Sequence, residues 1–166
     1  MIFLGIGSNL NSKFGNRFLN IKKTLDLILY EKIKIKKISS FYETPSYPNL
    51  KNPRFINIVI QIEFNLSPEN LLKKILFIEN KMERTRSLKN EPRTCDIDII
   101  DYDKKIIKAT KSQNLTIPHP KMHKRNFVLL PLFEIAKTWI HPLKKTSIKD
   151  LINALDAEDL RTIKLI

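Results

Sequence analysis

FINIVIQIEFNLSPENLLKKILFIEN, residues 55–80, joins a strand pattern to a helix pattern through one short turn. Apolar residues alternate along its first part, residues 55–65, as is typical of a β-strand with two unlike faces. Ser67, Pro68 and Glu69 then supply an N-cap, a proline at the first helical position and an acidic first turn. The apolar residues that follow have helical spacing and share one side: Leu71, Leu72, Ile75, Ile78 and Met82. The stretch therefore predicts a strand followed by a helix.

The residues before this stretch predict a second strand and helix. MIFLGIGSNL, residues 1–10, begins as an apolar strand and ends in a Gly-Ser-Asn turn signal. Helical spacing follows from Asn16 to about residue 30, and residues 32–43 form an extended pattern in which the step from Ile35 to Ile38 indicates a bulge. Residues 44–55 contain three prolines, so we expect a long loop there.

After the central stretch the pattern returns to a strand and then to helices. A polar loop precedes TCDIDIIDY, residues 94–102, which is a third clear strand. We expect short extended pieces over 106–117 and a loop over 117–127. A helix is predicted over 128–139, with Pro131 near its first turn, and a short final helix over 147–155.

This order of elements predicts an α+β fold. Strand, helix, strand, strand, helix, strand is a split β-α-β plan, with helices packed on a largely antiparallel sheet. The chain has 166 residues, and it shows no internal repeat, low-complexity segment or linker. We therefore expect a single domain over residues 1–166.

Composition limits the class of partner. The chain is 42% hydrophobic, enough for a buried core, and its formal net charge of +13 indicates an anionic partner: a nucleotide, a nucleic acid or an acidic membrane surface. The richness in Lys, Ile and Asn is that of an AT-rich genome, which accounts for part of this charge. No apolar run is long enough to span a membrane and the first residues lack a signal peptide, so we expect a cytoplasmic protein. The only cysteine, Cys95, is interpreted as a small buried hydrophobe.

The predicted strand at 94–102 carries two carboxylates on one face. Side chains two apart on a strand point the same way, so Asp96 and Asp98 lie together while Cys95, Ile97 and Ile99 point to the core. Two like charges this close repel, and a divalent cation such as Mg²⁺ would resolve the repulsion. The alternative is a polar strand face that meets solvent. Asp101 and Asp103 are interpreted as turn residues at the end of the strand.

Cationic residues surround this pair in sequence. Arg84, Arg86 and Lys89 precede it, and Arg93 lies three residues before Asp96. They could form plain salt bridges or a phosphate clamp, and the net charge favours the clamp. A lone histidine such as His119 in a proline-rich loop is more often a plain hydrogen-bonding residue than a functional one. No zinc spacing and no glycine-rich phosphate loop is present.

Six motifs in order resemble one family. They are IGSNL (6–10), SSFYETP (39–45), FIN (55–57), PRTCDIDI (92–99), IPHPKM (117–122) and RNFVLLPLFEIA (125–136). Together they are similar to the 6-hydroxymethyl-7,8-dihydropterin pyrophosphokinases of folate synthesis, from residue 2 to about residue 155. The resemblance implies a ferredoxin-like α/β sandwich and the transfer of pyrophosphate from ATP to the pterin hydroxymethyl group, with release of AMP.

The resemblance also implies roles for individual residues. Asp96 and Asp98 would hold two Mg²⁺ ions, and Arg84, Arg93 and Asp98 would act in catalysis. The residues that would bind ATP are Arg84, Arg86, Arg93, Ile99, Thr116, His119 and Arg125. The residues that would bind the pterin are Thr44, Pro45, Tyr47, Phe55, Asn57 and Phe127. The implied protein is a monomer that binds small molecules, with neither nucleic acid nor membrane as partner.

Three positions depart from the family pattern, and two other readings remain. Glu91 stands where many relatives have glycine, Asn90 where some have tryptophan, and Pro120 where some have an aromatic residue. An RNA-binding α+β module would fit the basic charge, but paired aspartates on its sheet would repel phosphate. A relative that binds pterin without turnover is disfavoured by the intact set of Asp96, Asp98, arginines and His119.

Overall fold

The fold is built on one antiparallel sheet, seen in a computed structural model that describes residues 1–84, 91–110 and 114–166. Within these residues the strand order is β5-β1-β4-β3-β6, and β2 pairs with the other end of β4. The strands are β1 (Ile2–Ser8), β2 (Lys34–Ile38), β3 (Tyr42–Thr44), β4 (Phe55–Glu63), β5 (Asp96–Tyr102) and β6 (Lys164–Leu165). The predicted α+β class and antiparallel sheet are confirmed.

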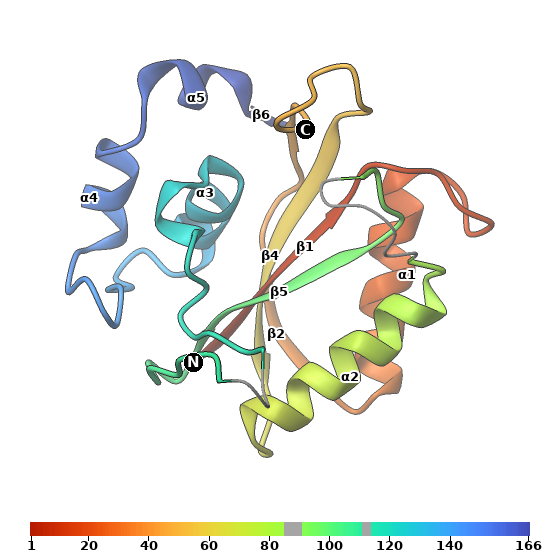
Figure 1. Ribbon diagram of the computed structural model, residues 1–166, viewed down its shortest axis with the longest axis horizontal. Helices are drawn as coiled ribbons and strands as arrows, with labels where there is room; N and C mark the ends of the chain where they lie inside the picture. The colour runs from red at the N-terminus through yellow and green to blue at the C-terminus, as the bar shows by residue number, and fades with distance from the viewer. Residues whose placement is uncertain (85–90, 111–113) are drawn as a thin grey trace.

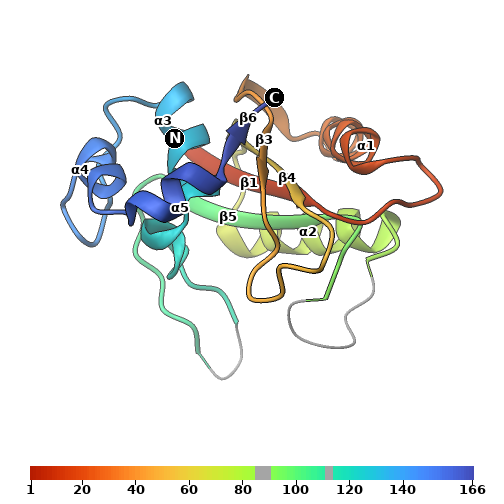
Figure 2. The ribbon, with the colours of Figure 1, turned by 90° about the horizontal axis from the view of Figure 1, so that it is seen from above.

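Helices cover both faces of this sheet (Figures 1 and 2). The helices are α1 (Arg17–Tyr30), α2 (Pro68–Lys81), α3 (Asn126–Ile135), α4 (Ile148–Asn153), α5 (Ala157–Thr162) and a 3₁₀ turn, η1 (Met122–Lys124). α1 and α2 lie on one face, and α3 lies on the other with α4 behind it. The helix predicted from Ser67 onward begins as expected, because the Ser67 side chain accepts a hydrogen bond from the Asn70 N–H and Pro68 follows it.

The central strand β1 divides the core into two parts. Ile2, Leu4 and Ile6 pack toward α1 and α2, whereas Phe3 packs with α3. The face of Phe3 continues along β1 as Gly5 and Gly7, which have no side chain to fill it. The α3 face of the sheet is therefore apolar beneath α3, and beyond it the side chains of Ile100, Asn57 and Phe55 lie against the two glycines.

The strand predicted over 32–43 is in fact two strands. The bulge is present, since the register between β2 and β4 shifts between Ile35 and Lys37. The chain then leaves the sheet at Ser39 and Ser40 and pairs with β4 again as β3. The Glu134 carboxylate of α3 accepts hydrogen bonds from the Ser40 backbone and hydroxyl and from Tyr42 Oη, which fixes this break.

The interpretation of Asp101 as a turn residue is wrong. Asp101 lies within β5, is 1% exposed, and accepts a 2.7 Å hydrogen bond from Trp139 Nε1. Burial raises the pKa of this carboxyl, and the Trp139 bond partly offsets the rise. The predicted helix over 128–139 is instead Asn126–Ile135, with Pro131 inside it. It ends because Ala136 leaves the helical region at φ −148°, so Trp139 can turn back to Asp101.

The final part of the chain holds more structure than predicted. α4 is not the last helix, since α5 and β6 follow it. Their lengths of six and two residues are too short for a periodic pattern to be read from the sequence. Among the described residues no helix is both long and apolar enough to cross a bilayer.

Candidate active site

Asp96 and Asp98 lie on β5 beside the glycines of β1. In the antiparallel register Asp96 is opposite Gly7 and Asp98 is opposite Gly5. Cys95, Ile97 and Ile99 are buried, as the strand alternation predicts. Burial raises the pKa of Cys95 to about 12, so this thiol is an inert core residue.

Arginines neutralise Asp96. Its Oδ1 lies 2.7 Å from Arg84 Nη1, and its Oδ2 lies 2.7 Å from Arg93 Nη2. The repulsion expected between the two carboxylates is therefore countered by guanidinium groups that the protein itself supplies. Both arginines are among the residues predicted from the sequence.

Asp98 has its own cationic neighbours. Arg125 Nη1 lies 3.1 Å from Asp98 Oδ2, and His119 Nε2 lies 3.8 Å from the same oxygen. Burial lowers the pKa of His119, while the Asp98 carboxylate opposes that change. Four cationic or titratable side chains from three separate segments thus lie around the two aspartates: Arg84, Arg93, His119 and Arg125.

Sequence reasoning missed Glu79, the buried residue that holds Arg84. Glu79 is 3% exposed, accepts a 2.9 Å hydrogen bond from the Ile97 N–H and is ion-paired with Arg84. It lies on α2 between Ile78 and Met82, in the stripe that faces the core. A glutamate inside an apolar helical stripe is a signal that could have identified it.

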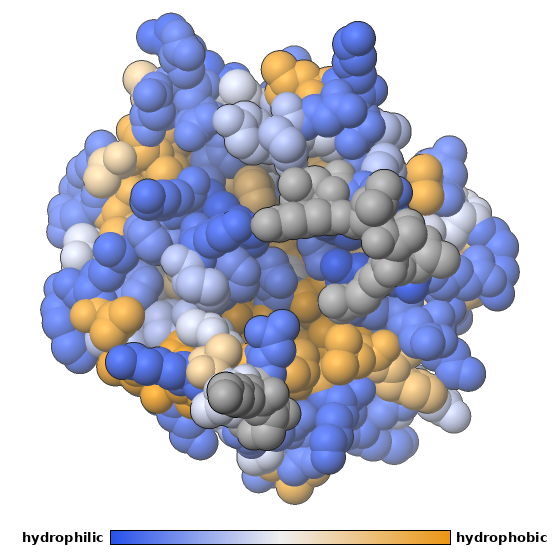
Figure 3. Space-filling model, in the orientation of Figure 1, coloured by the Kyte–Doolittle hydropathy of each residue, from blue (hydrophilic) through white to orange (hydrophobic). Residues whose placement is uncertain are grey.

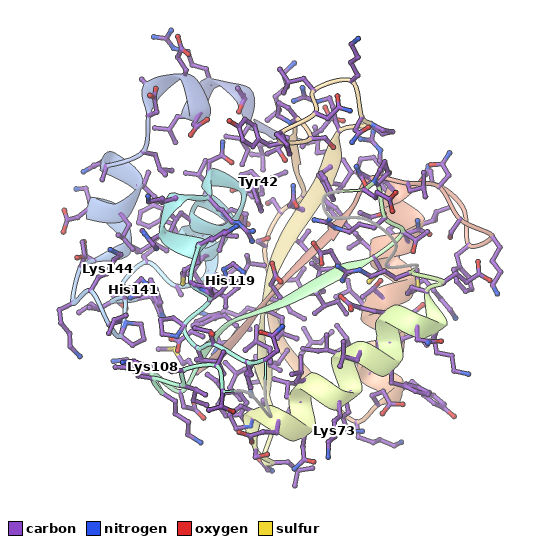
Figure 4. All side chains as sticks on the ribbon, viewed as in Figure 1. Tyr42, Lys73, Lys108, His119, His141 and Lys144 are labelled. Carbon is purple, nitrogen blue, oxygen red and sulfur yellow. The ribbon has the colours of Figure 1, made fainter. Side chains whose placement is uncertain are left out.

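A cleft of about 880 Å³ opens along β5, between α2 and residues 114–120. Asp96, Asp98 and Arg84 line it, as do two predicted nucleotide contacts, Ile99 and Thr116. In Figure 4, Lys73 marks its α2 side and His119 the opposite side. An apolar strip is visible along α2 in Figure 3, and the apolar α2 residues that line the cleft are Leu72, Ile75 and Leu76. The cleft therefore has an apolar wall and a charged end.

A buried polar pair, Asn57 and Thr44, lies next to the charged end. Asn57 Nδ2 donates a 3.0 Å hydrogen bond to Thr44 Oγ1, and both residues are buried. A Cβ on Gly7 would lie 3.0 Å from Asn57 Oδ1 and 3.5 Å from the ring of Phe55. Asn57 and Phe55 thus pack closely against Gly7, where a side chain could be added only if they shifted.

The guanidinium group of an arginine lies over each of two aromatic rings, Phe55 and Phe127. The guanidinium carbon of Arg93 lies 5.0 Å from the Phe55 centroid, and that of Arg125 lies 5.5 Å from the Phe127 centroid. Arg93 Nε is buried and has no hydrogen-bond partner among the residues that the structure describes. A buried N–H without a partner is costly, so a ligand acceptor is expected at this position.

Asn9 connects Arg93 to the loop between β3 and β4. Its Oδ1 accepts a 2.7 Å hydrogen bond from the Arg93 N–H, and its Nδ2 donates to Ser46 Oγ and to the Pro53 carbonyl, each at 3.0 Å. The motif IGSNL contains this residue, although the sequence alone does not reveal its partners.

Some predicted residues are not brought together. Tyr47 is 86% exposed, and Pro45 is half-buried in the same loop. Arg86, Lys89 and Asn90 lie outside the described residues. Of the departures from the family pattern, Pro120 lines the cleft, and the Glu91 carbonyl accepts a 3.4 Å bond from Arg93 Nη1.

An antiparallel α+β sandwich whose edge strand presents two aspartates among arginines has the charge pattern expected of the class of proteins that bind phosphate groups. The sequence specifies the class further, since residues 3–137 match the model of the 7,8-dihydro-6-hydroxymethylpterin-pyrophosphokinase (HPPK) family. The chain belongs to this family of pyrophosphokinases in folate synthesis.

Curated relatives agree with this assignment. The chain is 35% identical over 149 residues to the 2-amino-4-hydroxy-6-hydroxymethyldihydropteridine pyrophosphokinase of Aquifex aeolicus, covering 90% of this chain and 88% of that protein. It is 33% identical to the folic acid synthesis protein fol1 of Pneumocystis carinii over 98% of this chain. It is 42% identical to the FOL1 protein of Dictyostelium discoideum over 86% of this chain. The chain spans only 21% and 20% of the lengths of these last two proteins.

Solved structures support the fold. The HPPK-DHPS protein of Plasmodium falciparum, crystallised as the A437G variant with pteroate, superposes with a TM-score of 0.71 at 17% identity. The match covers 99% of this chain and 46% of that chain. A second structure, an HPPK-DHPS in complex with substrates, gives a TM-score of 0.68 at 16% identity over 92% of this chain and 42% of that chain.

Proposed function

We propose that this chain transfers pyrophosphate from ATP to the hydroxymethyl group of 6-hydroxymethyl-7,8-dihydropterin and releases AMP, as a step of tetrahydrofolate synthesis. The observation that carries the proposal is the position of Arg93. It pairs with Asp96, covers the Phe55 ring, and keeps a buried Nε without a partner in the described residues. An arginine in this position can contact a polyphosphate and an aromatic substrate at once.

The cleft along β5 suits the nucleotide. Its wall of α2 side chains and Ile99 offers apolar contact to an adenine ring, and Thr116 and His119 border the same space. The Ile97 N–H points out of the sheet edge toward Glu79, and strand alternation places the Ile99 N–H and carbonyl on that edge as well. We propose that the base lies here and that the phosphates reach Arg84, Arg93 and Arg125.

The residues fit a Mg²⁺ site that is completed by phosphate. Asp96 and Asp98 share one face of β5, and the Asp98 side chain is 36% exposed. The described residues contain no cluster of three or more Asp, Glu, His or Cys that could enclose a metal. Mg²⁺ often binds one or two carboxylates and takes its other ligands from water and substrate phosphates. Bound by these two residues, two ions would neutralise the phosphates and acidify the hydroxymethyl oxygen.

The polar pair of Asn57 and Thr44 suits the pterin. Asn57 offers a donor and an acceptor to the edge of the heterocycle, with Thr44 beside it. Phe55 and Phe127 are the proposed walls for stacking, after Arg93 and Arg125 turn toward the phosphates. Pro45 and Tyr47 would join from their loop when substrate is bound.

We propose direct in-line transfer. The hydroxymethyl oxygen attacks the β-phosphorus of ATP, the bond from that phosphorus to the α-phosphate oxygen breaks, and AMP leaves. Asp98 is the proposed acceptor of the hydroxyl proton, and Arg84 and Arg93 stabilise the charge that moves to the leaving oxygen. Such a reaction depends on positioning and charge neutralisation rather than on a protein nucleophile.

The test is AMP formation in the presence of ATP, MgCl₂ and 6-hydroxymethyl-7,8-dihydropterin, with each component omitted in turn. We expect AMP and the pterin diphosphate in equal amounts, only when all three are present. ADP in place of AMP, or AMP formed without the pterin, would overturn the proposal. We further propose a cytoplasmic monomer without a nucleic-acid partner, which sedimentation and RNA-binding measurements test.

A further inference from the structure

Helix α5 and strand β6 contact both sides of the proposed pterin pocket without belonging to the core. No residue of α5 is buried, and both residues of β6 are exposed. The segment crosses from the side of α4 to the end of the sheet where β3 and β4 meet (Figure 1). Its contacts are therefore polar or between strands, and it contributes little apolar burial to the stability of the domain.

On the first side, the segment binds the residue next to Phe55. Arg54 Nη2 donates a 3.0 Å hydrogen bond to the Thr162 carbonyl, and Arg54 Nε donates a 3.0 Å bond to Glu43. β6 also pairs with β3 through Tyr42 and Glu43. The segment therefore contacts this end of the sheet both through Arg54 and through strand pairing. These bonds restrain the start of β4, and with it Phe55.

On the second side, the segment binds the residue between Arg125 and Phe127. Asn126 is 8% exposed, and its Nδ2 donates a 2.5 Å hydrogen bond to the Asp159 carbonyl. The Thr162 hydroxyl donates a 2.8 Å bond to the same carbonyl. α3 begins at Asn126, and no side chain caps that end of the helix. The bonds to α5 therefore supply the restraint that a cap would otherwise provide.

We propose that α5 is a positioning element that holds the Phe55 side and the Phe127 side of the pocket at a set separation, with Arg54 and Asn126 as its two points of attachment. A planar heterocycle stacked between two rings requires that separation, so loosening either attachment weakens binding. The inference rests on the proposed function for the identity of the ligand. The link between the Phe55 side and the Phe127 side does not depend on that function.

The first experiment measures the Kd of 6-hydroxymethylpterin by fluorescence for Arg54→Met, Asn126→Asp and the double variant. Asn126→Asp keeps the shape but turns the donor into an acceptor that faces the Asp159 carbonyl. Each single variant is expected to raise Kd by about three- to tenfold, the effect of losing one or two hydrogen bonds. The double variant should bind the pterin hardly less tightly than the single variant that binds it more weakly, because both substitutions release the same element, α5. Two effects that simply multiply would overturn the proposal.

The second experiment needs no ligand. Hydrogen exchange is followed at the Val128 and Leu129 amides, which bond to the Arg125 carbonyl in the first turn of α3. Arg54→Met is expected to speed their exchange because it removes the bond to the Thr162 carbonyl of α5, although among the described residues Arg54 has no hydrogen bond or ion pair with α3 itself. The control, Arg161→Gln, changes an exposed residue of the same helix and should leave exchange unchanged. Unchanged exchange in Arg54→Met would refute the link. A wild type that binds no pterin would refute the proposed function instead.

Discussion

The Arg93 guanidinium lies over the Phe55 ring at 5.0 Å while its Nη2 lies 2.7 Å from Asp96 Oδ2. One side chain thus touches a residue from each of the two proposed substrate sites. Without ligands it covers the ring on which the pterin would stack, and it neutralises a carboxylate that would bind Mg²⁺. In the proposed complex with both substrates, Arg93 exchanges these partners for phosphate.

Arg93→Ala tests this exchange. We expect kcat to fall by about 10²- to 10³-fold, because charge on the transferred group loses a donor, while the pterin Kd changes by less than about threefold. Steady-state kinetics measure kcat, and a fluorescence titration measures the pterin Kd. Lys105→Ala is the control, since it removes a cation over Tyr102, 5.1 Å from that ring and at the other end of β5. Weaker pterin binding with a normal kcat would contradict the assigned role.

Asp96→Asn and Asp98→Asn test the metal assignment. Each is expected to abolish AMP formation at any MgCl₂ concentration, because an amide is a poor ligand for Mg²⁺ and leaves arginines uncompensated. Pterin binding measured without metal should survive in both variants. Asp103→Asn, which alters an exposed carboxylate just beyond β5, is the control and should remain active. Near-normal turnover in either site variant would exclude the metal role.

The sequence predicts the main features of the fold because they follow from local patterns. Strand alternation places Asp96 and Asp98 on one face, and the Ser67-Pro68 signal marks the start of α2, as observed. Both are properties of a few adjacent residues. Two arginine partners, Arg84 and Arg93, also lie near in sequence, whereas Arg125 is nominated only by the order of the motifs.

The features that the sequence could not predict depend on contacts between distant segments. Asp101 looks like a turn residue until Trp139 is seen to donate to it from beyond α3. The strand over 32–43 is divided because Glu134, far along the chain, binds the backbone of Ser40. α5 and β6 are too short for a periodic signal and are held by Arg54 and Asn126.

Glu79→Gln tests the buried support of Arg84. The variant keeps the shape and an acceptor for the Ile97 N–H but removes the charge that faces the guanidinium. We expect a loss of about 1–3 kcal/mol in the free energy of unfolding and a fall in kcat, since Arg84 loses its anchor. Urea unfolding and AMP assays provide both numbers. A fall in stability with an unchanged kcat would limit Glu79 to a structural role.

Gly7→Ala tests the proposed pterin site at Asn57 and Phe55. The added methyl would lie 3.0 Å from Asn57 Oδ1 and 3.5 Å from the Phe55 ring, so it displaces the two residues proposed to bind the pterin. We expect pterin affinity to fall by about tenfold, with nucleotide affinity little changed. Gly5→Ala is the matched control on the same strand, where the methyl meets only the Ile100 side chain, at 3.3 Å. It should cost stability but not pterin affinity. Equal losses of pterin affinity in both variants would place the pterin elsewhere.

His141→Asn tests a pH dependence of stability that lies outside the site. The His141 Nδ1 accepts hydrogen bonds from the Leu143 and Lys144 N–H groups, and burial, with His123 and Lys144 nearby, lowers its pKa to about 4. An unfolded histidine titrates near 6.5, so between these values the unfolded chain binds more protons and stability rises with pH. As pH falls from 6.5 to 4 the protein should lose up to about 3 kcal/mol through this residue.

Asparagine can keep the acceptor at the position of Nδ1 without titrating, so His141→Asn should flatten this part of the stability curve. Urea unfolding of both proteins at pH 7 and pH 5 measures the difference between the two slopes. The control is His123→Asn, which removes the ring 6.0 Å from that of His141 and leaves His141 in place, so most of the dependence should remain. If the wild type and His141→Asn lose stability in parallel, burial of His141 is not the source of the acid sensitivity.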